Sequence, residues 1–219
     1  MNLKEIEKAC APARILAVSK LQSVAKIRAL YDEGQRQFGE NYVQEALEKI
    51  TALEELTEIE WHFIGHLQKN KTKFVAGKFK LIHSVDSLAL SLHLSKHCQA
   101  LQVIQNILIQ VNLAGEESKG GFGKEELLTH WPELTQMPNL KICGLMTMPP
   151  LTETGENVRH YFQELRQLRE TLKLTTDLNR HPLTELSMGT SHDYKVAAEE
   201  GATIVRLGTI LFGERTRKM

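Results

Sequence analysis

A lysine follows directly on an apolar run near the start of the chain, where Ile15–Val18 leads into Ser19 and Lys20. If this run is a buried strand, Lys20 projects from a wall of low polarity. Partial burial disfavours the ammonium form, and the free amine that results can form an imine with an aldehyde. The alternative is a lysine that lays its stem along a rim and keeps its charge in water. Lys20 is therefore a candidate nucleophile.

Two clusters of small residues in the last part of the chain indicate an anion site. The first, SMGTS at Ser187–Ser191, leads into a predicted helix, and the backbone N–H groups at a helix start favour an anion. Thr190 and Ser191 could equally be ordinary helix caps. The second cluster is Gly208-Thr209. Loops after strands seven and eight of a (β/α) barrel commonly bind phosphate, so the two clusters together predict a phosphorylated ligand.

An arginine, Arg206, stands just before the second cluster. Its guanidinium could bind the predicted phosphate or another acceptor on the ligand. The alternative is an ion pair with a carboxylate at the ends of the strands, such as Glu40.

Other patterns carry less information. The spacing of His62, His66 and His83 matches no zinc-ligand pattern, so no metal site is predicted. The basic run Lys69–Lys73 is typical of the solvated first turns of a helix. The glycine-rich stretch Gly115–Gly123 is not a P-loop, because no GK[ST] follows it.

Short apolar runs alternate along the chain with longer stretches whose apolar residues recur at three- and four-residue spacing. This rhythm predicts parallel strands joined by helices. Polar residues stand at the ends of most runs, where a (β/α) barrel places its chemistry. The eight predicted strands are Arg14–Lys20, Gln37–Asn41, Glu60–Gly65, Leu81–Asp86, Asn106–Asn112, Lys141–Met148, Glu185–Gly189 and Thr203–Gly208.

The fold class expected from this alternation is α/β. Eight strand–helix units fill the chain, whereas open sheets usually have fewer strands, so a closed (β/α)8 TIM barrel is favoured over an open doubly wound sheet. We expect one domain over residues 1–219, with an extra helix at its start. The predicted helices are Leu3–Cys10, Ser23–Glu33, Tyr42–Leu56, Gln68–Phe79, Ser87–Gln99, Lys124–Gln136, Glu156–Asp177 and His192–Glu200.

Composition excludes several classes of protein. The 219 residues carry 27 basic and 27 acidic side chains, so a net charge of zero gives no reason to expect nucleic-acid binding. No apolar stretch approaches the ~20 residues of a membrane span, and no signal sequence is expected. Three cysteines without CxxC spacing indicate neither a disulfide framework nor zinc. We expect a cytoplasmic protein.

Several motifs resemble one family along nearly the whole chain, from Ile15 to Gly213 and in the same order. That family is the pyridoxal phosphate homeostasis proteins, also called the YggS/PROSC family. The motifs are AVSK at Ala17–Lys20, FGENYVQE at Phe38–Glu45, WHFIGHLQKNK at Trp61–Lys71, IHSVD at Ile82–Asp86, QVNLAGEESKGGF at Gln110–Phe122, GLMTMPP at Gly144–Pro150, SMGTSHDY at Ser187–Tyr194 and VRLGTILFG at Val205–Gly213.

The resemblance implies a fold-type-III pyridoxal 5'-phosphate (PLP) barrel, similar to the N-terminal domain of alanine racemase. It implies that Lys20 holds the cofactor as an internal aldimine and that Arg206 faces the pyridine nitrogen. The other cofactor-binding residues that it implies are Ser191, Gly208 and Thr209 at the phosphate, Ser187 and Gly189 in the turn, and Asn41, His83 and Met146 in the pocket. The chain departs from many relatives at Thr190 and His192, which leaves the details of this loop open.

The implied function is binding of PLP for its homeostasis, through storage, buffering or delivery, without robust catalysis. A permanently charged arginine at the ring nitrogen weakens the ring as an electron sink. The alternatives are an amino-acid racemase and a Schiff-base aldolase. A racemase needs a second acid or base, which the related racemase takes from a further domain, and the eight units leave no residues for such a domain. We expect a monomer, with PLP-dependent apoenzymes as recipients.

Overall fold

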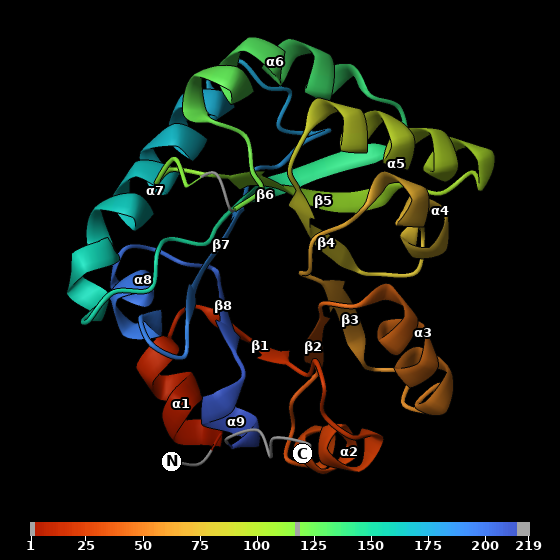
Figure 1. The fold of residues 1–219 in the computed structure, drawn as a ribbon, viewed down its shortest axis with the longest axis vertical. Coiled ribbons are helices and arrows are strands. Elements are labelled where there is room, and N and C mark those ends of the chain that lie inside the picture. Colours follow the sequence, from red (N-terminus) through yellow and green to blue (C-terminus); the bar gives the residue numbers. More distant parts are fainter. Residues whose placement is uncertain (1–2, 117–118, 214–219) are drawn as a thin grey trace.

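The computed structural model describes residues 3–116 and 119–213, and its strands form a closed parallel barrel (Figure 1). Each strand pairs with its neighbours in the chain, and pairing of β1 with β8 closes the barrel. The (β/α)8 prediction is thereby confirmed over the open-sheet alternative. The strands are β1 (Arg14–Val18), β2 (Gln37–Glu40), β3 (Glu60–Phe63), β4 (Leu81–Val85), β5 (Gln105–Val111), β6 (Leu140–Thr147), β7 (Glu185–Thr190) and β8 (Ile204–Leu207).

Helices surround the barrel and connect its strands (Figure 1). The extra helix at the start, α1, packs against α8 and β1. In the described part of the chain, no helix has the length and apolarity needed to span a bilayer. The helices are α1 (Leu3–Cys10), α2 (Val24–Asp32), α3 (Val43–Ala52), η1 (Lys69–Lys71), α4 (Thr72–Val75), α5 (Leu88–Ala100), α6 (Lys124–Gln136), η2 (Gly155–Val158), α7 (Arg159–Lys173), α8 (Tyr194–Glu199) and α9 (Thr209–Phe212).

The structure differs from the predicted elements mainly where strands and helices end. The helix predicted over Gln68–Phe79 is a 3-10 turn followed by one short helix, and the chain leaves the helical conformation before Gly77, whose φ is +72°. β1 and β2 end early, so Lys20 and Asn41 lie in the turns after their strands. The short helix α9 is not predicted by the sequence pattern.

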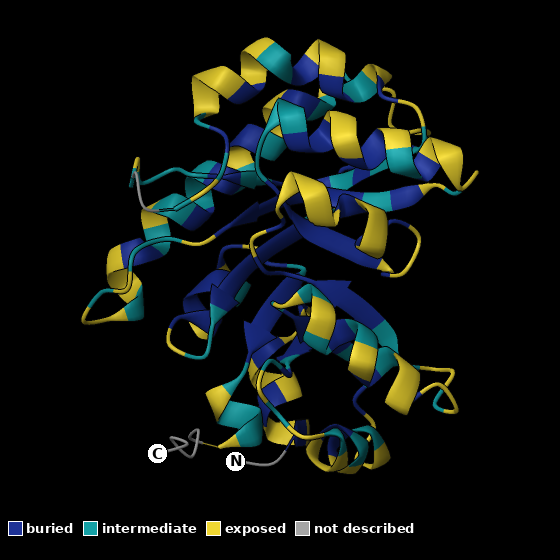
Figure 2. Cartoon of the chain, turned by 45° about the vertical axis from the view of Figure 1, so that its right-hand side comes forward, coloured by how far each residue is buried: buried dark blue, intermediate teal, exposed yellow. Residues whose placement is uncertain are grey.

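Side chains of the strands alternate between the inside of the barrel and the core beneath the helices, as a period of two requires. Leu16 belongs to a small cluster inside the barrel, whereas Ile15 and Ala17 belong to the larger core between strands and helices. Figure 2 shows the strands mostly buried and the helices exposed on their outer faces. The interior cluster comprises Leu16, Ile64, Leu81, Leu108, Met146 and Ile204.

Candidate functional site

Lys20 and Asn41 are the polar residues that follow β1 and β2. They lie at the carboxyl end of the barrel, where barrel enzymes bind their ligands. Lys20 is half-buried and shares the phase of Leu16, whose side chain lies inside the barrel. Ser19 has the opposite phase, and its Oγ donates to Glu40 Oε1 at 2.6 Å. Lys20 itself lies in the turn that follows β1 at this end of the barrel.

The predicted phosphate residues meet beside the end of β1. The register of β1 and β8 pairs Ala17 with Leu207, so Gly208 follows next to Val18. A Cβ built on Gly208 would lie 3.6 Å from Val18 Cβ, an ordinary van der Waals contact. The backbone N–H of Gly208 donates to Ser191 Oγ at 3.2 Å, which joins the loops after β7 and β8. Lys20 follows two residues after Val18, so all three positions share one sector of the mouth.

Thr209, the remaining predicted phosphate residue, is exposed and begins α9 directly after Gly208. The first N–H groups of a helix have no partner within it, so this turn offers donors to an anion. Its role at a phosphate stays a prediction.

The turn at the end of β7 requires glycine. Gly189 has a φ of +89°, and a Cβ there would lie 2.5 Å from Ala197 Cβ on α8. Both strain and overlap therefore exclude a side chain. Thr190 then donates its N–H (2.5 Å) and its hydroxyl (3.0 Å) to Asp193 Oδ1 and thereby closes the turn onto α8. Ser191 lies within this turn, and its Oγ accepts the hydrogen bond from the N–H of Gly208.

Arg206 lies inside the barrel wall and is 5% exposed. Its Nη1 donates to Ser187 Oγ at 2.7 Å, and its Nη2 donates to the carbonyl oxygen of Thr147 at 2.8 Å. Burial lowers the pKa of Arg206 to about 10, so the guanidinium stays charged at neutral pH. The alternative ion pair with Glu40 is wrong, because Glu40 faces outward and pairs with Lys49.

A chain of buried polar groups continues from Arg206 across the barrel. Ser187 Oγ lies 2.8 Å from His83 Nδ1, and His83 Nε2 lies 2.9 Å from His62 Nδ1. Desolvation lowers the pKa of His62 to about 4 and that of His83 well below its usual value. Both imidazoles are therefore neutral at pH 7. Each contact then needs one donor and one acceptor. The tautomer of His83 therefore determines whether His62 Nδ1 donates or accepts.

We predict that this histidine pair makes the protein less stable as the pH falls from about 6.5. In the unfolded chain the two histidines bind protons near pH 6.5, whereas in the folded protein they stay neutral. Below that pH, each histidine therefore lowers the free energy of unfolding by about 1.4 kcal/mol per pH unit. Urea unfolding at pH 7.5, 6.5 and 5.5 measures the slope. The variant His62→Gln removes one titration and should flatten it, and equal slopes for both proteins would contradict the prediction.

Two predicted pocket residues complete the mouth. Met146 is fully buried in the interior cluster. Asn41 follows β2, and its Oδ1 is buried without a hydrogen-bond partner among the described residues. A buried amide oxygen without a partner is costly, and a donor from a ligand would remove that cost. The residues at this end therefore fit a ligand that carries an aldehyde, a polar ring and a phosphate, as PLP does.

Some groups near the site have other partners. His66 is exposed and its Nδ1 lies 3.2 Å from Asp86 Oδ2, apart from the pair His62 and His83. No three His, Cys, Asp or Glu side chains in residues 3–116 and 119–213 come close enough together to hold a metal ion. Glu45 and Lys49 border the end of β1 from outside the wall, and their four-residue spacing on a predicted helix is the only signal for them in the sequence.

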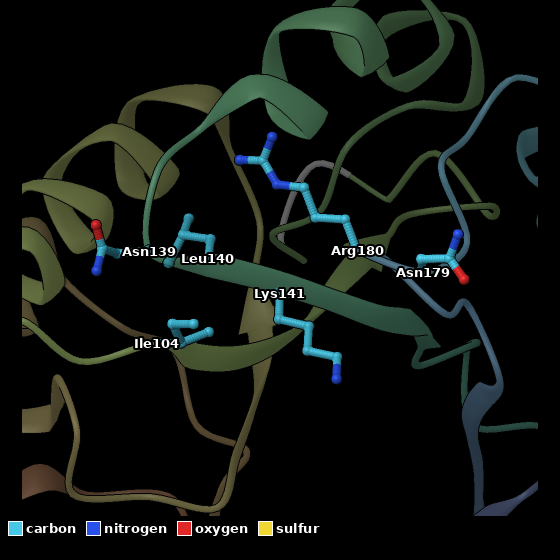
Figure 3. A pocket seen from close by; sticks show the side chains of 6 residues that line it. All are labelled: Ile104, Asn139, Leu140, Lys141, Asn179 and Arg180. Carbon is cyan, nitrogen blue, oxygen red and sulfur yellow. The ribbon is translucent and has the colours of Figure 1, made fainter.

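A hollow of about 260 Å³ lies at the other end of the barrel, near the start of β6 (Figure 3). Figure 3 shows its two cationic side chains, Lys141 and Arg180, pointing away from each other. None of the predicted site residues lines it. The hollow is lined by Ile104, Asn139, Leu140, Lys141, Asn179 and Arg180.

Comparison with known proteins agrees with this geometry. The family model described as "Alanine racemase, N-terminal domain" matches residues 1–216. A pyridoxal phosphate homeostasis protein of Aquifex aeolicus is 46% identical, over 97% of this chain and 95% of the relative. The homologue of the same name from Escherichia coli is 40% identical, over 92% of this chain and 85% of the relative.

Solved structures show the same fold. PipY of Synechococcus elongatus, solved with PLP bound, superposes with a TM-score of 0.90 at 38% identity and covers 96% of this chain and 98% of its own. Alanine racemase of Bartonella henselae has a TM-score of 0.70 at 20% identity, over 97% of this chain and 58% of that one, and shares the fold. The chain therefore belongs to the pyridoxal phosphate homeostasis protein family and has the fold of the alanine racemase N-terminal domain.

Proposed function

We propose that this protein binds PLP through Lys20 and takes part in PLP homeostasis. The observation that carries the proposal is the junction of Ser191 and Gly208 beside the end of β1, in the same sector of the mouth as Lys20. One ligand with an aldehyde and a phosphate suits both features. The structure of PipY with PLP bound supports the assignment.

Each site residue receives a role in this proposal. When bound, PLP supplies an aldehyde that condenses reversibly with a primary amine and releases water. Lys20 supplies the amine, and Arg206 occupies the side of the ring nitrogen. Ser191, Gly208 and Thr209 hold the phosphate, Ser187 and Gly189 shape the turn that supports it, and Asn41, His83 and Met146 line the pocket around the ring.

We further propose that the protein stores, buffers or delivers PLP without robust turnover. Arg206 is buried and charged, so it opposes protonation of a ring nitrogen next to it and weakens the ring as an electron sink. The relatives carry the name of homeostasis proteins, which supports a non-catalytic role. PLP-dependent apoenzymes are the proposed recipients.

The proposed unit is a single-domain monomer over residues 1–219 that works in the cytoplasm. The match of the family model to residues 1–216 supports one domain. Cys10, Cys98 and Cys143 are all free thiols, and a reducing compartment suits them.

A peptide map after borohydride reduction tests this function. We expect the purified protein with PLP to absorb near ~420 nm, and we expect reduction to fix the cofactor on the peptide that contains Lys20. Fixation elsewhere, or none, would reject the proposal. An assay with alanine and serine accompanies the map, since Lys20-dependent racemisation would show an enzyme instead of a carrier.

A further inference from the structure

A cluster of charged side chains, buried except for the partly exposed Glu45, lies just outside the barrel wall, behind Lys20. It consists of Lys49, Glu40 and Glu45, and we call it the Lys49 cluster. Lys49 Nζ lies 2.8 Å from Glu40 Oε1 and 2.6 Å from Glu45 Oε1. The side chains of Lys49 and Glu40 are 7% and 0% exposed. Apolar side chains of similar volume often stabilise a protein as well as a buried ion pair does, so stability alone does not explain this cluster.

The cluster holds the chain on both sides of Lys20. On one side, Lys49 Nζ donates to the carbonyl oxygen of Ser19 at 2.7 Å, and Ser19 Oγ donates to Glu40 at 2.6 Å. On the other side, the backbone N–H of Leu21 donates to Glu45 Oε1 at 2.6 Å. Lys20 is therefore the residue between two anchored neighbours.

The conformation of this turn needs such anchors. Leu21 has a φ of +60°, in a region that residues other than glycine rarely adopt. Its side chain is 61% exposed, so apolar packing contributes little to holding it there. The backbone N–H of Gln22 donates to the carbonyl oxygen of Ser19 at 3.0 Å and closes this turn. The charge-assisted hydrogen bond to Glu45 adds a side-chain anchor on Leu21 itself, and such bonds are stronger than neutral ones.

The cluster also separates the two lysines chemically. Lys49 donates to Ser19, Glu40 and Glu45, which uses all three hydrogens of its ammonium group. Held in this way, its nitrogen has no lone pair with which to attack a carbonyl. Lys20 lies in the half-buried turn at the mouth, whereas Lys49 lies outside the wall, so we take Lys20 as the amine of this pair that an aldehyde in the barrel reaches.

From these contacts we propose that the Lys49 cluster is a positioning device for Lys20. By fixing Ser19 and Leu21, it presents the amine of Lys20 to the barrel mouth, so that capture of an aldehyde is fast. This inference rests on the proposed function, since it concerns the same lysine. Glu45 is a positioning residue here, because it acts on Lys20 through the backbone of Leu21.

The test compares Glu45→Ala with Glu45→Gln in the full chain. Alanine removes the acceptor for Leu21, whereas glutamine keeps a carbonyl oxygen there. We expect Glu45→Ala to slow covalent capture of PLP, measured by stopped-flow absorbance, about 10- to 100-fold, since misplacing a reacting group by about 1 Å has effects of this size. Glu45→Gln should recover most of the rate. The control Glu48→Ala changes an exposed carboxylate on the same helix and should leave the rate unchanged.

A second ligand separates positioning from general damage to the site. Pyridoxine 5'-phosphate keeps the ring and phosphate but has no aldehyde, so Lys20 cannot capture it. We expect Glu45→Ala to bind it as tightly as wild type, by calorimetry. Equal capture rates in Glu45→Ala and wild type would overturn this inference alone, and so would a parallel loss of affinity for both ligands. If wild type forms no adduct at Lys20, the proposed function fails first and the inference falls with it.

Discussion

Replacing Lys20 with alanine should abolish covalent capture of PLP and weaken its binding about 100-fold or more. Without a positioned amine, only hydrogen bonds and charges at the ring and the phosphate remain to hold the ligand. Lys20 lies two residues beyond Val18, beside the junction of Gly208 with Ser191. It is the one lysine among the proposed site residues, so none of the others replaces its amine. Borohydride fixation, absorbance near ~420 nm and equilibrium dialysis measure the three effects.

The control for this experiment is Lys96→Ala. Lys96 is an exposed lysine on α5, and its removal should leave fixation and affinity unchanged. Substitution of Lys20 should also leave the fold intact, because the residue is only half-buried and lies in a turn. A Lys20→Ala protein that still gave the same reducible adduct would remove Lys20 from the site.

Replacing Gly65 with alanine should destabilise the barrel by about 3 kcal/mol or more. A Cβ on Gly65 would lie 1.9 Å from the carbonyl oxygen of Asn41 and 2.6 Å from its Cα. These are backbone atoms, so the turns after β2 and β3 would have to separate. Because Asn41 lies in the first of these turns, binding of PLP should weaken as well. Urea unfolding and titration with PLP measure the two losses.

Gly208→Ala is the control for the loss of stability expected in Gly65→Ala. Gly208 also lies at the mouth, but its φ is −113° and a Cβ there meets Val18 at an ordinary distance of 3.6 Å. Its free energy of unfolding should change by less than about 1 kcal/mol. Equal losses of stability for Gly65→Ala and Gly208→Ala would show that the close approach at Asn41 is not the cause.

The sequence pattern predicts the barrel because that pattern is local. Side chains along the run RILAV point alternately to the two faces of the strand, so one set lies inside the barrel and the other outside. Eight such runs with helices between them suit a closed barrel better than an open sheet. The ends of elements are less well defined, and the segment up to Phe79 shows why. Its apolar pattern continues to Phe79, but the chain leaves the helix at Ala76 and turns at Gly77 with a positive φ.

The sequence alone thus determined the order of strands, the lysine after the first and the small-residue loops after the last two. Only the tertiary structure decided the partners of the charged groups. Arg206 bonds Ser187 and Thr147 inside the wall, whereas Glu40 turns outward to Lys49. The physical reason is that local periodicity gives the face on which a side chain lies, while strand register and the packing of helices on strands decide what it meets there.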